Sequence, residues 1–362
     1  MRVAAVEARP LRSLVDVRLD LEVGIVSLVG PNGAGKTNLL EALYFALTGR
    51  SFRTADRREL IPFGGQFARA EARVRDENGV EHRFLASVSR AEGRRHLLDG
   101  SAASPSVLTH SRPPVAVFSP DRLTLIKGPP GERRAHLDHY AAARWAARAQ
   151  LRQRYGQALA QRNALLARLA GGGGSGDLEV WDATLAAAAA ELVAARAEAA
   201  AELAGPFAQA ALELGLEKGV TLEYAPRAPG GAEEIRAGLA ERREADLRLG
   251  RTSWGPHLDE LKIAMDGRAL RRYGSQGQQR TALLALLFAE REALRAAGRA
   301  APLLLLDDVM SELDPERRER LVDRIGDDGQ ALITAAAEES VPARARAHLV
   351  RMPIAAPEAI AA

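Results

Sequence analysis

The sequence predicts an α/β fold, built on a mostly parallel sheet covered by helices on both faces, with a helical part inserted into it. Three observations support this prediction. A short apolar run at residues 24–29 leads into a glycine-rich turn and then into a helical pattern over 36–47. Helical and strand patterns alternate again over residues 277–334. Between these regions lies a long alanine-rich helical stretch, interrupted once by GGGGSG at residues 171–176.

Composition excludes several classes of protein. A chain of 362 residues with 47% hydrophobic and 27% charged residues can bury one large core, or a main domain with a smaller satellite. It has no cysteine, which excludes disulfides and thiolate metal sites. The N-terminus lacks a secretory pattern and the longest apolar run, Thr281 to Ala289, is too short to cross a bilayer, so we expect a cytoplasmic protein without a membrane partner. A sequence pI near 9.4 allows an anionic partner such as nucleic acid.

The other elements follow from local patterns in chain order. Residues 14–19 alternate like a half-exposed strand, residues 67–90 form a hairpin pattern around Asn78-Gly79, and residues 115–118 are a short apolar strand. In the alanine-rich stretch we expect two helices of about 35 residues, roughly 55 Å each, forming an antiparallel hairpin. Later patterns predict strands at 220–224, 258–265, 303–306 and 331–334, and helices at 277–297 and 315–325. The expected organisation is a main lobe of residues 1–120 and 265–362 and an inserted helical lobe of residues 121–264.

The glycine-rich turn fits G-x-x-x-x-G-K-[ST] and stands between a strand and a helix, as that motif requires. Its residues are Gly30, Pro31, Asn32, Gly33, Ala34, Gly35, Lys36 and Thr37. The glycines let successive backbone N–H groups point at a phosphate, and the helix N-terminus adds partial positive charge. Lys36 is one of four lysines in a chain with 46 arginines, and its compact ammonium suits the outer phosphates of a nucleotide. Thr37 offers a hydroxyl to Mg²⁺, so we predict phosphate binding over a glycine turn that matches by chance.

A second motif, LLLLDD at residues 303–308, is an apolar strand that ends in two carboxylates. Ligands of parallel sheets lie beyond the carboxyl ends of the strands, so we expect Asp307 and Asp308 beside the phosphate-binding turn. Asp307 would hold Mg²⁺ through water. Asp308 would orient the attacking water or accept its proton. Acidic residues are common at strand ends, so this pair indicates a nucleotide site only together with the glycine-rich turn at residues 30–37.

A third motif, YGSQGQQR at residues 273–280, is a small polar turn ahead of an apolar helix. Such a turn can bind an anion at the helix N-terminus, and it is also an ordinary helix cap. Its position shortly before the acidic strand favours anion binding.

Together the three motifs resemble those of ABC-type ATPase heads, in which a Ser-Gly-Gly-Gln-like signature follows a helical lobe and precedes the acidic strand. The matching residues are Ser275, Gln276, Gly277 and Gln278, and Gln276 departs from the usual glycine. The resemblance implies a homodimer in ATP, with the nucleotide held by the loop of one copy and covered by the signature of the other. A triphosphate also needs donors on its open side, which one loop cannot supply. Residues 311–314, SELD, resemble the family loop that communicates across the dimer.

More specific segments resemble the RecF family of bacterial recombination-mediator ATPases. In order they are GPNGAGKTNLLEALYFALTGRSFRT, VFSPDRLTLIKGPPGERRAHLD, GPHLDE, YGSQGQQRTALLAL and LLLLDDVMSELD. The resemblance implies an ABC-type ATPase head with a short helical second lobe, ATP and Mg²⁺ as cofactors, and binding of double-stranded, gapped or junction DNA without sequence readout. It also implies RecO and RecR as partners and a role in loading RecA onto DNA coated by single-strand-binding protein.

Three positions depart from a general ABC-type head. Asp308 stands where a catalytic Glu is usual and its side chain is shorter, so we expect slow, switch-like, DNA-dependent hydrolysis. Thr334 stands where a His is usual after the next strand, and Ser119, or alternatively Gln66, where a Gln is usual. These departures disfavour a transporter subunit, which shares the three motifs. A scaffold that is assembled by ATP and scarcely hydrolyses it stays open as an alternative.

Two groups of arginines are candidates for contacts with DNA phosphates. Arg144, Arg148 and Arg152 recur every four residues in the first expected hairpin helix, residues 132–169. A second group follows the helix of the phosphate-binding turn and comprises Arg50, Arg53, Arg57 and Arg58. Each group is equally well explained as a solvated surface of an arginine-rich chain. His257 has no expected chemical role, and we expect it to be buried and hydrogen-bonded.

Overall fold

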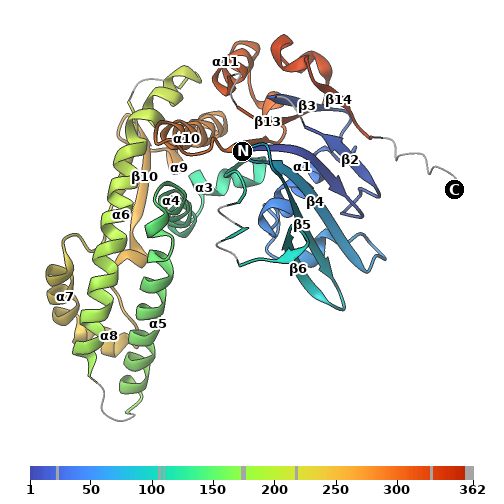
Figure 1. Ribbon diagram of the computed structural model, residues 1–362. Coiled ribbons are helices and arrows are strands. Elements are labelled where there is room, and N and C mark those ends of the chain that lie inside the picture. Colours follow the sequence, from blue (N-terminus) through green and yellow to red (C-terminus); the bar gives the residue numbers. More distant parts are fainter. Residues whose placement is uncertain are drawn as a thin grey trace. The chain divides into compact units, whose positions relative to one another are not determined.

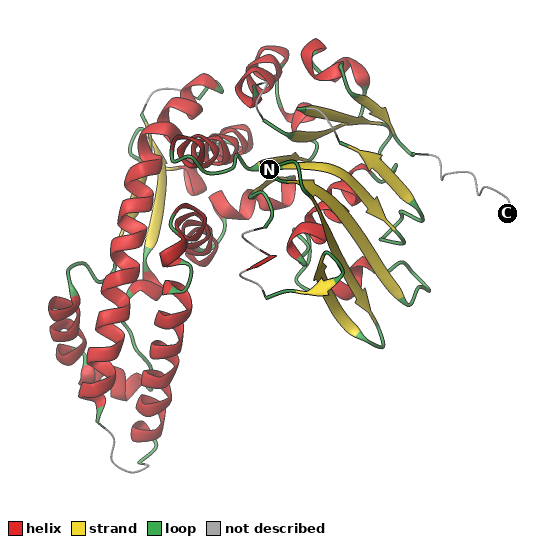
Figure 2. Ribbon diagram, in the orientation of Figure 1, coloured by secondary structure: helices red, strands yellow, loops and turns green. Residues whose placement is uncertain are grey.

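The computed structural model describes residues 1–21, 24–104, 107–108, 111–172, 177–216, 219–326 and 329–354 of the chain. Its contacts divide the chain into two compact units. The head unit comprises Met1–Arg122 and Ala300–Ala362, and the helical unit comprises Leu123–Arg299. In Figure 1 the head unit takes the two ends of the colour scale, and Figure 2 shows that most strands belong to it while helices dominate the helical unit.

The head unit contains two sheets. A five-stranded parallel sheet has the order β14-β3-β13-β12-β8, and a six-stranded antiparallel sheet has the order β2-β1-β4-β5-β6-β7. The strands of the parallel sheet are β3 (Ile25–Val29), β8 (Val115–Phe118), β12 (Leu303–Leu306), β13 (Ala331–Ala335) and β14 (Leu349–Arg351). Those of the antiparallel sheet are β1 (Arg2–Ala8), β2 (Val17–Asp20), β4 (Phe67–Arg75), β5 (Glu81–Ser89), β6 (Gly93–Leu98) and β7 (Ser101–Ala102).

Helix α1, Lys36–Thr48, lies in the core between the two sheets. It packs against β4 and β5 of the antiparallel sheet and against β13 of the parallel sheet. Leu39, Leu40 and Leu43 are fully buried, and most of the helix is apolar, as expected for a helix enclosed on both sides. The other long helix of this unit, α11 (Pro315–Ile325), connects β12 to β13 and is capped by Asp314. The strand–helix–strand order fixes the phosphate-binding turn at the carboxyl edge of the parallel sheet.

The helical unit is organised around α6, Leu178–Glu213, against which α4, α5, α7, α10 and β9 all pack. Its helices are α3 (Thr124–Lys127), α4 (Pro130–Arg144), α5 (Leu151–Ala170), α6, α7 (Ala232–Glu241), α8 (Arg243–Leu249), α9 (Leu270–Tyr273) and α10 (Gln276–Ala296). Its small antiparallel sheet has the order β11-β10-β9, formed by Arg268–Ala269, Glu260–Met265 and Val220–Ala225. Figure 1 shows α6 and α5 side by side along the unit.

Two buried arginines fasten α5 and α6 to the rest of the helical unit. Arg162 of α5 is fully buried and donates to Asp182 and Asp246, each at 2.7 Å. Arg196 of α6 donates to Asp138 at 2.7 Å and to Asp259 at 2.9 Å. Removing one partner of such a buried pair typically costs about 3–5 kcal/mol, because it leaves the other charge uncompensated. These networks supplement a core that is rich in alanine and poor in aromatic side chains.

Most expected elements are confirmed, including the parallel sheet, the hairpin of β4 and β5, and the strands at 115–118 and 303–306. The single helix expected over 132–169 is wrong: α4 ends at Arg144, and α5 begins only at Leu151. Trp145 adopts extended backbone at this break, and its ring lies under two guanidinium groups, which periodicity could not reveal. Residues 173–176 of the expected flexible turn lie outside the described residues.

Of the two boundaries between the units, the first lies close to its expected position and the second does not. The first boundary, expected after residue 120, lies after Arg122. The second was expected at residue 265, whereas the contacts keep the chain in the helical unit as far as Arg299. The reason is that α10 packs along α6. Within the described ranges, every helix is too short or too polar to serve as a transmembrane span.

Candidate nucleotide-binding site

The phosphate-binding loop, residues 30–37, joins β3 to α1 and has the backbone that a glycine loop requires. Gly33 and Gly35 have φ angles of 85° and 90°, in the left-handed region that favours glycine. At Gly30 an added Cβ would lie 2.4 Å from the Met352 carbonyl oxygen, so the chain passes too close for any side chain. Gly35 is the N-cap of α1 and has no side chain that could bond the first amides of the helix. These amides are therefore available to an anion.

Lys36 lies folded over this loop. Its Nζ donates hydrogen bonds to the carbonyl oxygens of Gly30 and Pro31, at 2.5 and 3.0 Å. Lys36 is only 9% exposed, so the ammonium charge sits above the loop and is largely shielded from solvent. Phosphate oxygens in place of the two neutral carbonyls would give the ammonium acceptors of opposite charge.

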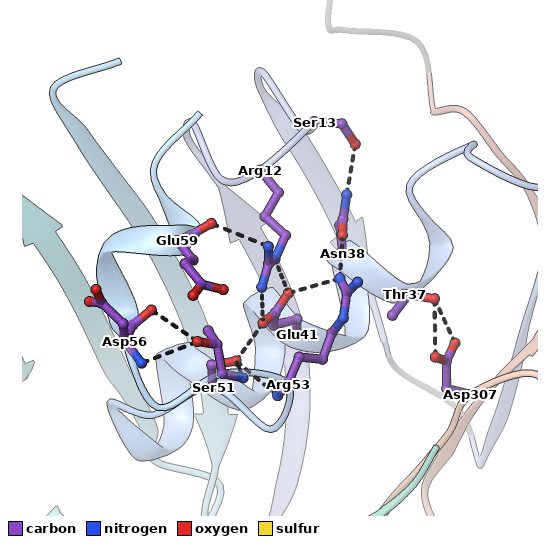
Figure 3. Close-up of polar contacts among 11 residues, drawn as sticks. Arg12, Ser13, Thr37, Asn38, Glu41, Ser51, Arg53, Asp56, Glu59 and Asp307 are labelled. Carbon is purple, nitrogen blue, oxygen red and sulfur yellow. Dashed lines mark hydrogen bonds and ion pairs between the residues drawn. The ribbon is translucent and has the colours of Figure 1, made fainter. Parts of the chain in front are cut away.

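Thr37, Asp307 and Thr334 meet at the carboxyl edge of the parallel sheet. The Thr37 hydroxyl lies 2.8 Å from Asp307 Oδ1 and 3.1 Å from Oδ2 (Figure 3). On the other side, the Thr334 hydroxyl donates to Asp307 Oδ1 at 2.9 Å. The three residues come from α1, the end of β12 and β13, so the sheet order β3-β13-β12 brings them together. The predicted proximity of the loop and the acidic strand is present in the structure.

The electrostatics of Asp307 favour a bound cation. Burial raises the pKa of its carboxyl above the usual range, while the hydroxyls of Thr37 and Thr334 lower it in part. A divalent cation would stabilise the charged form that burial disfavours. The Thr37 hydroxyl and the Asp307 carboxylate are hard oxygen donors, and Mg²⁺ typically takes one or two protein ligands with phosphate and water completing its shell. The donor set therefore fits Mg²⁺ carried by a nucleotide, and the described residues contain no cluster of three or more His, Cys, Asp or Glu for a metal held by protein alone.

Asp308 directly follows Asp307 and has strained backbone. Its φ and ψ angles of 51° and 28° lie in the left-handed region, which few residues other than glycine and, less often, Asn or Asp adopt. Its N–H donates to the Thr334 hydroxyl at 2.7 Å, so one hydroxyl holds both consecutive acidic residues. Within the described part of the chain, no protein group donates a hydrogen bond to the Asp308 carboxylate, which leaves it free to bind water. Strain of this kind is often found where a structure holds a functional side chain.

The structure refines the positions of three residues that depart from general ABC-type heads. Thr334 is fully buried in β13, the strand expected at 331–334. Ser119 follows β8 and is level with Asp307, whose N–H donates to the Phe118 carbonyl at 2.8 Å. The Ser119 hydroxyl is buried and has no hydrogen-bond partner among the described residues, so it could serve the site. Gln66 is exposed ahead of β4, and no contact joins it to Thr37 or Asp307 in the described chain.

A buried carboxylate on α1 was missed by the sequence patterns. Glu41 is fully buried, one turn after Thr37, and Figure 3 shows the groups that surround it. Arg12 donates to both of its oxygens, and Ser51 donates at 2.5 Å and Arg53 at 3.4 Å. Arg53 also donates to Asn38 Oδ1 at 3.2 Å. The network ties α1 to the segments before and after it, and an acid on the buried face of an apolar helix was its only signal in the sequence.

The signature segment belongs to the helical unit, where it begins α10. Ser275 is the N-cap, and a reciprocal pair of hydrogen bonds with Gln278 forms a capping box. Ser275, Gln276 and Gly277 are exposed, so the first turn of a 21-residue helix faces solvent. The segment is therefore both a helix cap and an accessible helix N-terminus, the two interpretations that the sequence left open.

The arginines of the broken helix do not form one continuous stripe. Arg144 donates to Glu202 at 2.9 Å and Arg148 to Glu198 at 2.5 Å, both acids of α6. Arg152 is more exposed and lies 3.8 Å from Asp138. The expected regular spacing along one helix is wrong because α4 and α5 are separate helices.

His257 lies in the helical unit as a hydrogen-bonded structural residue. Its Nδ1 lies 2.7 Å from the Tyr155 hydroxyl and its Nε2 3.3 Å from the Thr252 carbonyl oxygen. Burial lowers the pKa of its imidazole. The ring is half-buried, in agreement with the structural role expected for it.

Comparisons with known proteins place the whole chain in one family. The model of the RecF/RecN/SMC N terminal domain matches residues 2–354. The DNA replication and repair protein RecF of Streptomyces avermitilis is 39% identical over 361 residues, covering 94% of this chain and 95% of that protein. The chain belongs to the RecF family. A RecF of Anaeromyxobacter sp. strain Fw109-5 is also 39% identical, over 89% of this chain and 88% of the relative.

Solved structures of the RecF family share the fold of this chain. A structure of the recombination mediator protein RecF with ATP, from the RecFOR pathway, has a TM-score of 0.84 and 28% identity, and the match covers 94% of this chain and 93% of that one. An Smc head bound to the C-terminal winged-helix domain of ScpA has a TM-score of 0.59 at 17% identity over 98% of this chain and 95% of that one, which shows a common fold only. The predicted ABC-type ATPase head with a helical second lobe is confirmed by these matches.

Proposed function

We propose that this chain is an ATP-dependent DNA-binding protein of recombinational repair. It binds ATP with Mg²⁺ in the head unit, forms a homodimer around the nucleotide, and associates with gapped or junction DNA without reading its sequence. Its partners are RecO and RecR, and the outcome is the loading of RecA. One observation carries the nucleotide part: the Thr37 hydroxyl and the Asp307 carboxylate, from opposite ends of the chain, meet 2.8 Å apart beside a glycine loop covered by Lys36. The DNA and partner parts are supported by membership of the RecF family.

The residues of the head unit have separate tasks toward the nucleotide. The amides at the start of α1 and Lys36 bind the phosphates, and Lys36 exchanges its two carbonyl acceptors for phosphate oxygens. Thr37 and Asp307 would hold Mg²⁺, which would supply positive charge to the phosphates. Thr334 fixes the carboxylate of Asp307 and the backbone of Asp308. Asp308 then accepts a proton from the water that attacks the γ-phosphate.

Two features support slow hydrolysis suited to a switch. Asp308 is shorter than the usual Glu, and its carboxylate starts from a backbone position fixed by the bond to Thr334. A carboxylate that stays farther from the attacking water gives less general-base assistance. The same observation favours a second candidate function, an ATP-assembled scaffold with negligible hydrolysis. The variant Asp308→Asn, which should bind ATP but not hydrolyse it, distinguishes the two functions. A switch that depends on hydrolysis should no longer release DNA in this variant, whereas a scaffold should release it as before.

The exposed start of α10 supports the dimer. Its free amides and the Ser275 hydroxyl are donors of the kind that a γ-phosphate needs on its open side. In the proposed dimer they cover the nucleotide held by the other copy. ATP is therefore an interface ligand, and its loss separates the copies.

Sedimentation velocity with and without ATP and Mg²⁺ tests this proposal, using the wild type and Ser275→Arg. The wild type should become dimeric in ATP, while the variant should bind ATP and stay monomeric because the long cation occupies the place of the phosphate. Asp177→Arg is the control, since it also places an arginine at the N-cap of a helix, that of α6, but outside the signature. A wild type that stays monomeric in saturating ATP while binding gapped DNA normally would contradict the dimer.

A further inference from the structure

Four arginines from three segments of the head unit lie around the end of α1. The helix ends at Thr48, and Gly49 follows in the left-handed conformation as its C-cap. Arg50 is exposed directly after it, and the Arg57 Nε donates to the Gly49 carbonyl at 2.7 Å. The structure thus folds the segment after α1 back onto the end of the helix.

Strand β6 contributes the third arginine to the same place. The His96 Nε2 lies 2.9 Å from the Ala46 carbonyl oxygen, and an added Cβ on Gly49 would lie 2.9 Å from the His96 Nδ1. This face of β6 is therefore packed on the last turn of α1. Arg94 lies two residues before His96 in the strand, so its side chain is on the same face, and it is exposed.

The positive charges of this group also act on one another. The pKa of Arg57 is lowered by burial and then by the positive charges of Arg94 and Arg50. The pKa of Arg112, a half-buried residue before β8, is lowered mainly by burial; Tyr44 opposes this shift, and the positive charge of Arg50 adds a smaller lowering. Among the described residues, no ion pair joins any of these four arginines to a carboxylate. We name Arg50, Arg57, Arg94 and Arg112 the α1-end cluster.

Several other surface arginines of the chain have acidic partners. Arg144, Arg148 and Arg154 pair with acids of α6, and Arg320 pairs with Glu316 in α11. A paired arginine must give up its partner to bind a phosphate, whereas the α1-end cluster already lacks counter-charge. The partial negative charge of a helix C-terminus, about half an elementary charge, is too small to balance four guanidinium groups.

We infer that the α1-end cluster is a contact surface for the phosphate backbone of double-stranded DNA. This inference rests on the proposed function, which supplies DNA as the polyanion, and it names the surface that binds it. Arg50 and Arg94, both exposed, contact phosphates directly. Arg57 and Arg112 are partly buried and hold backbone carbonyls, at 2.7 Å from Gly49 and 3.2 Å from Pro113, so they add positive potential from behind. No base-edge readout is involved.

Arg53 follows α1 in the sequence together with Arg50 and Arg57, but its side chain lies elsewhere in the structure. Arg53 turns toward Glu41 and Asn38, whereas Arg57 bonds the Gly49 carbonyl at the C-terminal end of α1. A change at Arg50 therefore leaves the nucleotide side of α1 intact. DNA binding and ATP binding can be tested independently on the full chain.

The salt dependence of DNA binding tests the inference. The double variant Arg50→Gln, Arg94→Gln is compared with the wild type and with the matched control Arg154→Gln, Arg320→Gln, which removes two paired surface arginines. Binding of a labelled 30-base-pair duplex is followed by fluorescence anisotropy at several salt concentrations in ATP and Mg²⁺. Loss of two phosphate contacts should lower the salt slope by about 1.8, so that the fall in affinity between about 50 and 200 mM salt is roughly 12-fold smaller. The control should keep the slope of the wild type.

Three results would overturn the inference or its premise, and they are distinguishable. A double variant with unchanged slope and affinity, while the wild type binds the duplex, removes this surface and leaves the proposed function intact. If polyglutamate binds the wild type but not the double variant while duplex binding is unaltered, the cluster binds an acidic protein. This result also removes the surface as a DNA contact and leaves the proposed function intact. A wild type that binds no duplex or gapped DNA in any nucleotide state refutes the proposed function itself. Binding of a fluorescent ATP analogue and the melting temperature should be the same in the wild type and both double variants, which excludes misfolding.

Discussion

Replacement of Thr334 by valine should destabilise the head unit and weaken its binding of Mg²⁺ and ATP. The change keeps the shape of a fully buried side chain and removes only its hydroxyl. The N–H of Asp308 then loses its acceptor, which costs about 1–3 kcal/mol for a buried donor, and the Asp307 carboxylate loses a donor worth about 1.5–3 kcal/mol. These effects share one hydroxyl and do not add fully, so we expect a loss of about 3 kcal/mol. For a unit of this size the melting temperature should fall by about 6–12 °C.

The destabilisation should also depend on pH. Burial places the folded-state pKa of Asp307 above its unfolded value, so ionisation of this group costs stability as the pH rises through the folded-state pKa. The Thr334 hydroxyl lowers that pKa, and its removal therefore raises the pKa further and increases the cost at pH 7. As the pH is lowered toward the pKa of Asp307, the difference between wild type and variant should shrink.

Thermal unfolding of both proteins between pH 7 and pH 5, with and without Mg²⁺ and ATP, measures these effects. Thr281→Val is the matched control, because Thr281 is equally buried but its hydroxyl only bonds the Gly277 carbonyl in the same helix. The control should change the melting temperature by a few degrees at most. The reasoning is refuted if Thr334→Val melts within a degree of the wild type and binds Mg²⁺ and ATP equally well.

Three further predictions follow from the structure. Asp308→Glu should raise the rate of ATP hydrolysis, because the longer side chain reaches nearer to the attacking water; an equal or lower rate of phosphate release with normal ATP binding would contradict this. Glu41→Gln should destabilise the head unit by about 2–4 kcal/mol in urea unfolding, since two arginines lose their buried counter-charge, while the exposed Glu59→Gln should change it by less than about 0.5 kcal/mol. The lowered pKa of His257 predicts that stability is lost as the pH falls below about 6.5, and equal pH slopes in wild type and His257→Gln would exclude this contribution.

The sequence predicted best those elements whose signal is local. The strand at 303–306, the helix at 315–325 and the phosphate-binding loop are each defined by an apolar run, a cap or a motif within a few residues. Of the antiparallel sheet, the sequence predicted the central hairpin and, with shifted bounds, the strand β2. Strand β6 has no clean alternation of buried and exposed residues, so its sequence GRRHLL gives no strand signal.

The sequence predicted the main residues of the site but not the contacts that join them. The loop and the acidic pair were found from their motifs, but the role of Thr334 depends on β13 lying between β3 and β12, which no local pattern reveals. The break at Trp145 was missed for a related reason, because alanine-rich sequence on both sides continues the helical period while the aromatic ring is held by tertiary contacts. The α1-end cluster combines residues from three separate segments; the sequence pointed to Arg50 and Arg57, but only the three-dimensional structure adds Arg94 and Arg112.

The order of the parallel sheet has a consequence for how the protein is made. Strand β3, which supports the phosphate-binding loop, is flanked by β13 and β14, and neither leaves the ribosome until more than 330 residues have been synthesised. The antiparallel sheet, in contrast, is complete in sequence by residue 102. A nascent or prematurely terminated chain therefore carries the glycine loop without the neighbouring strands that give it a fixed shape. A chain that binds nucleotide has therefore been translated at least as far as these strands.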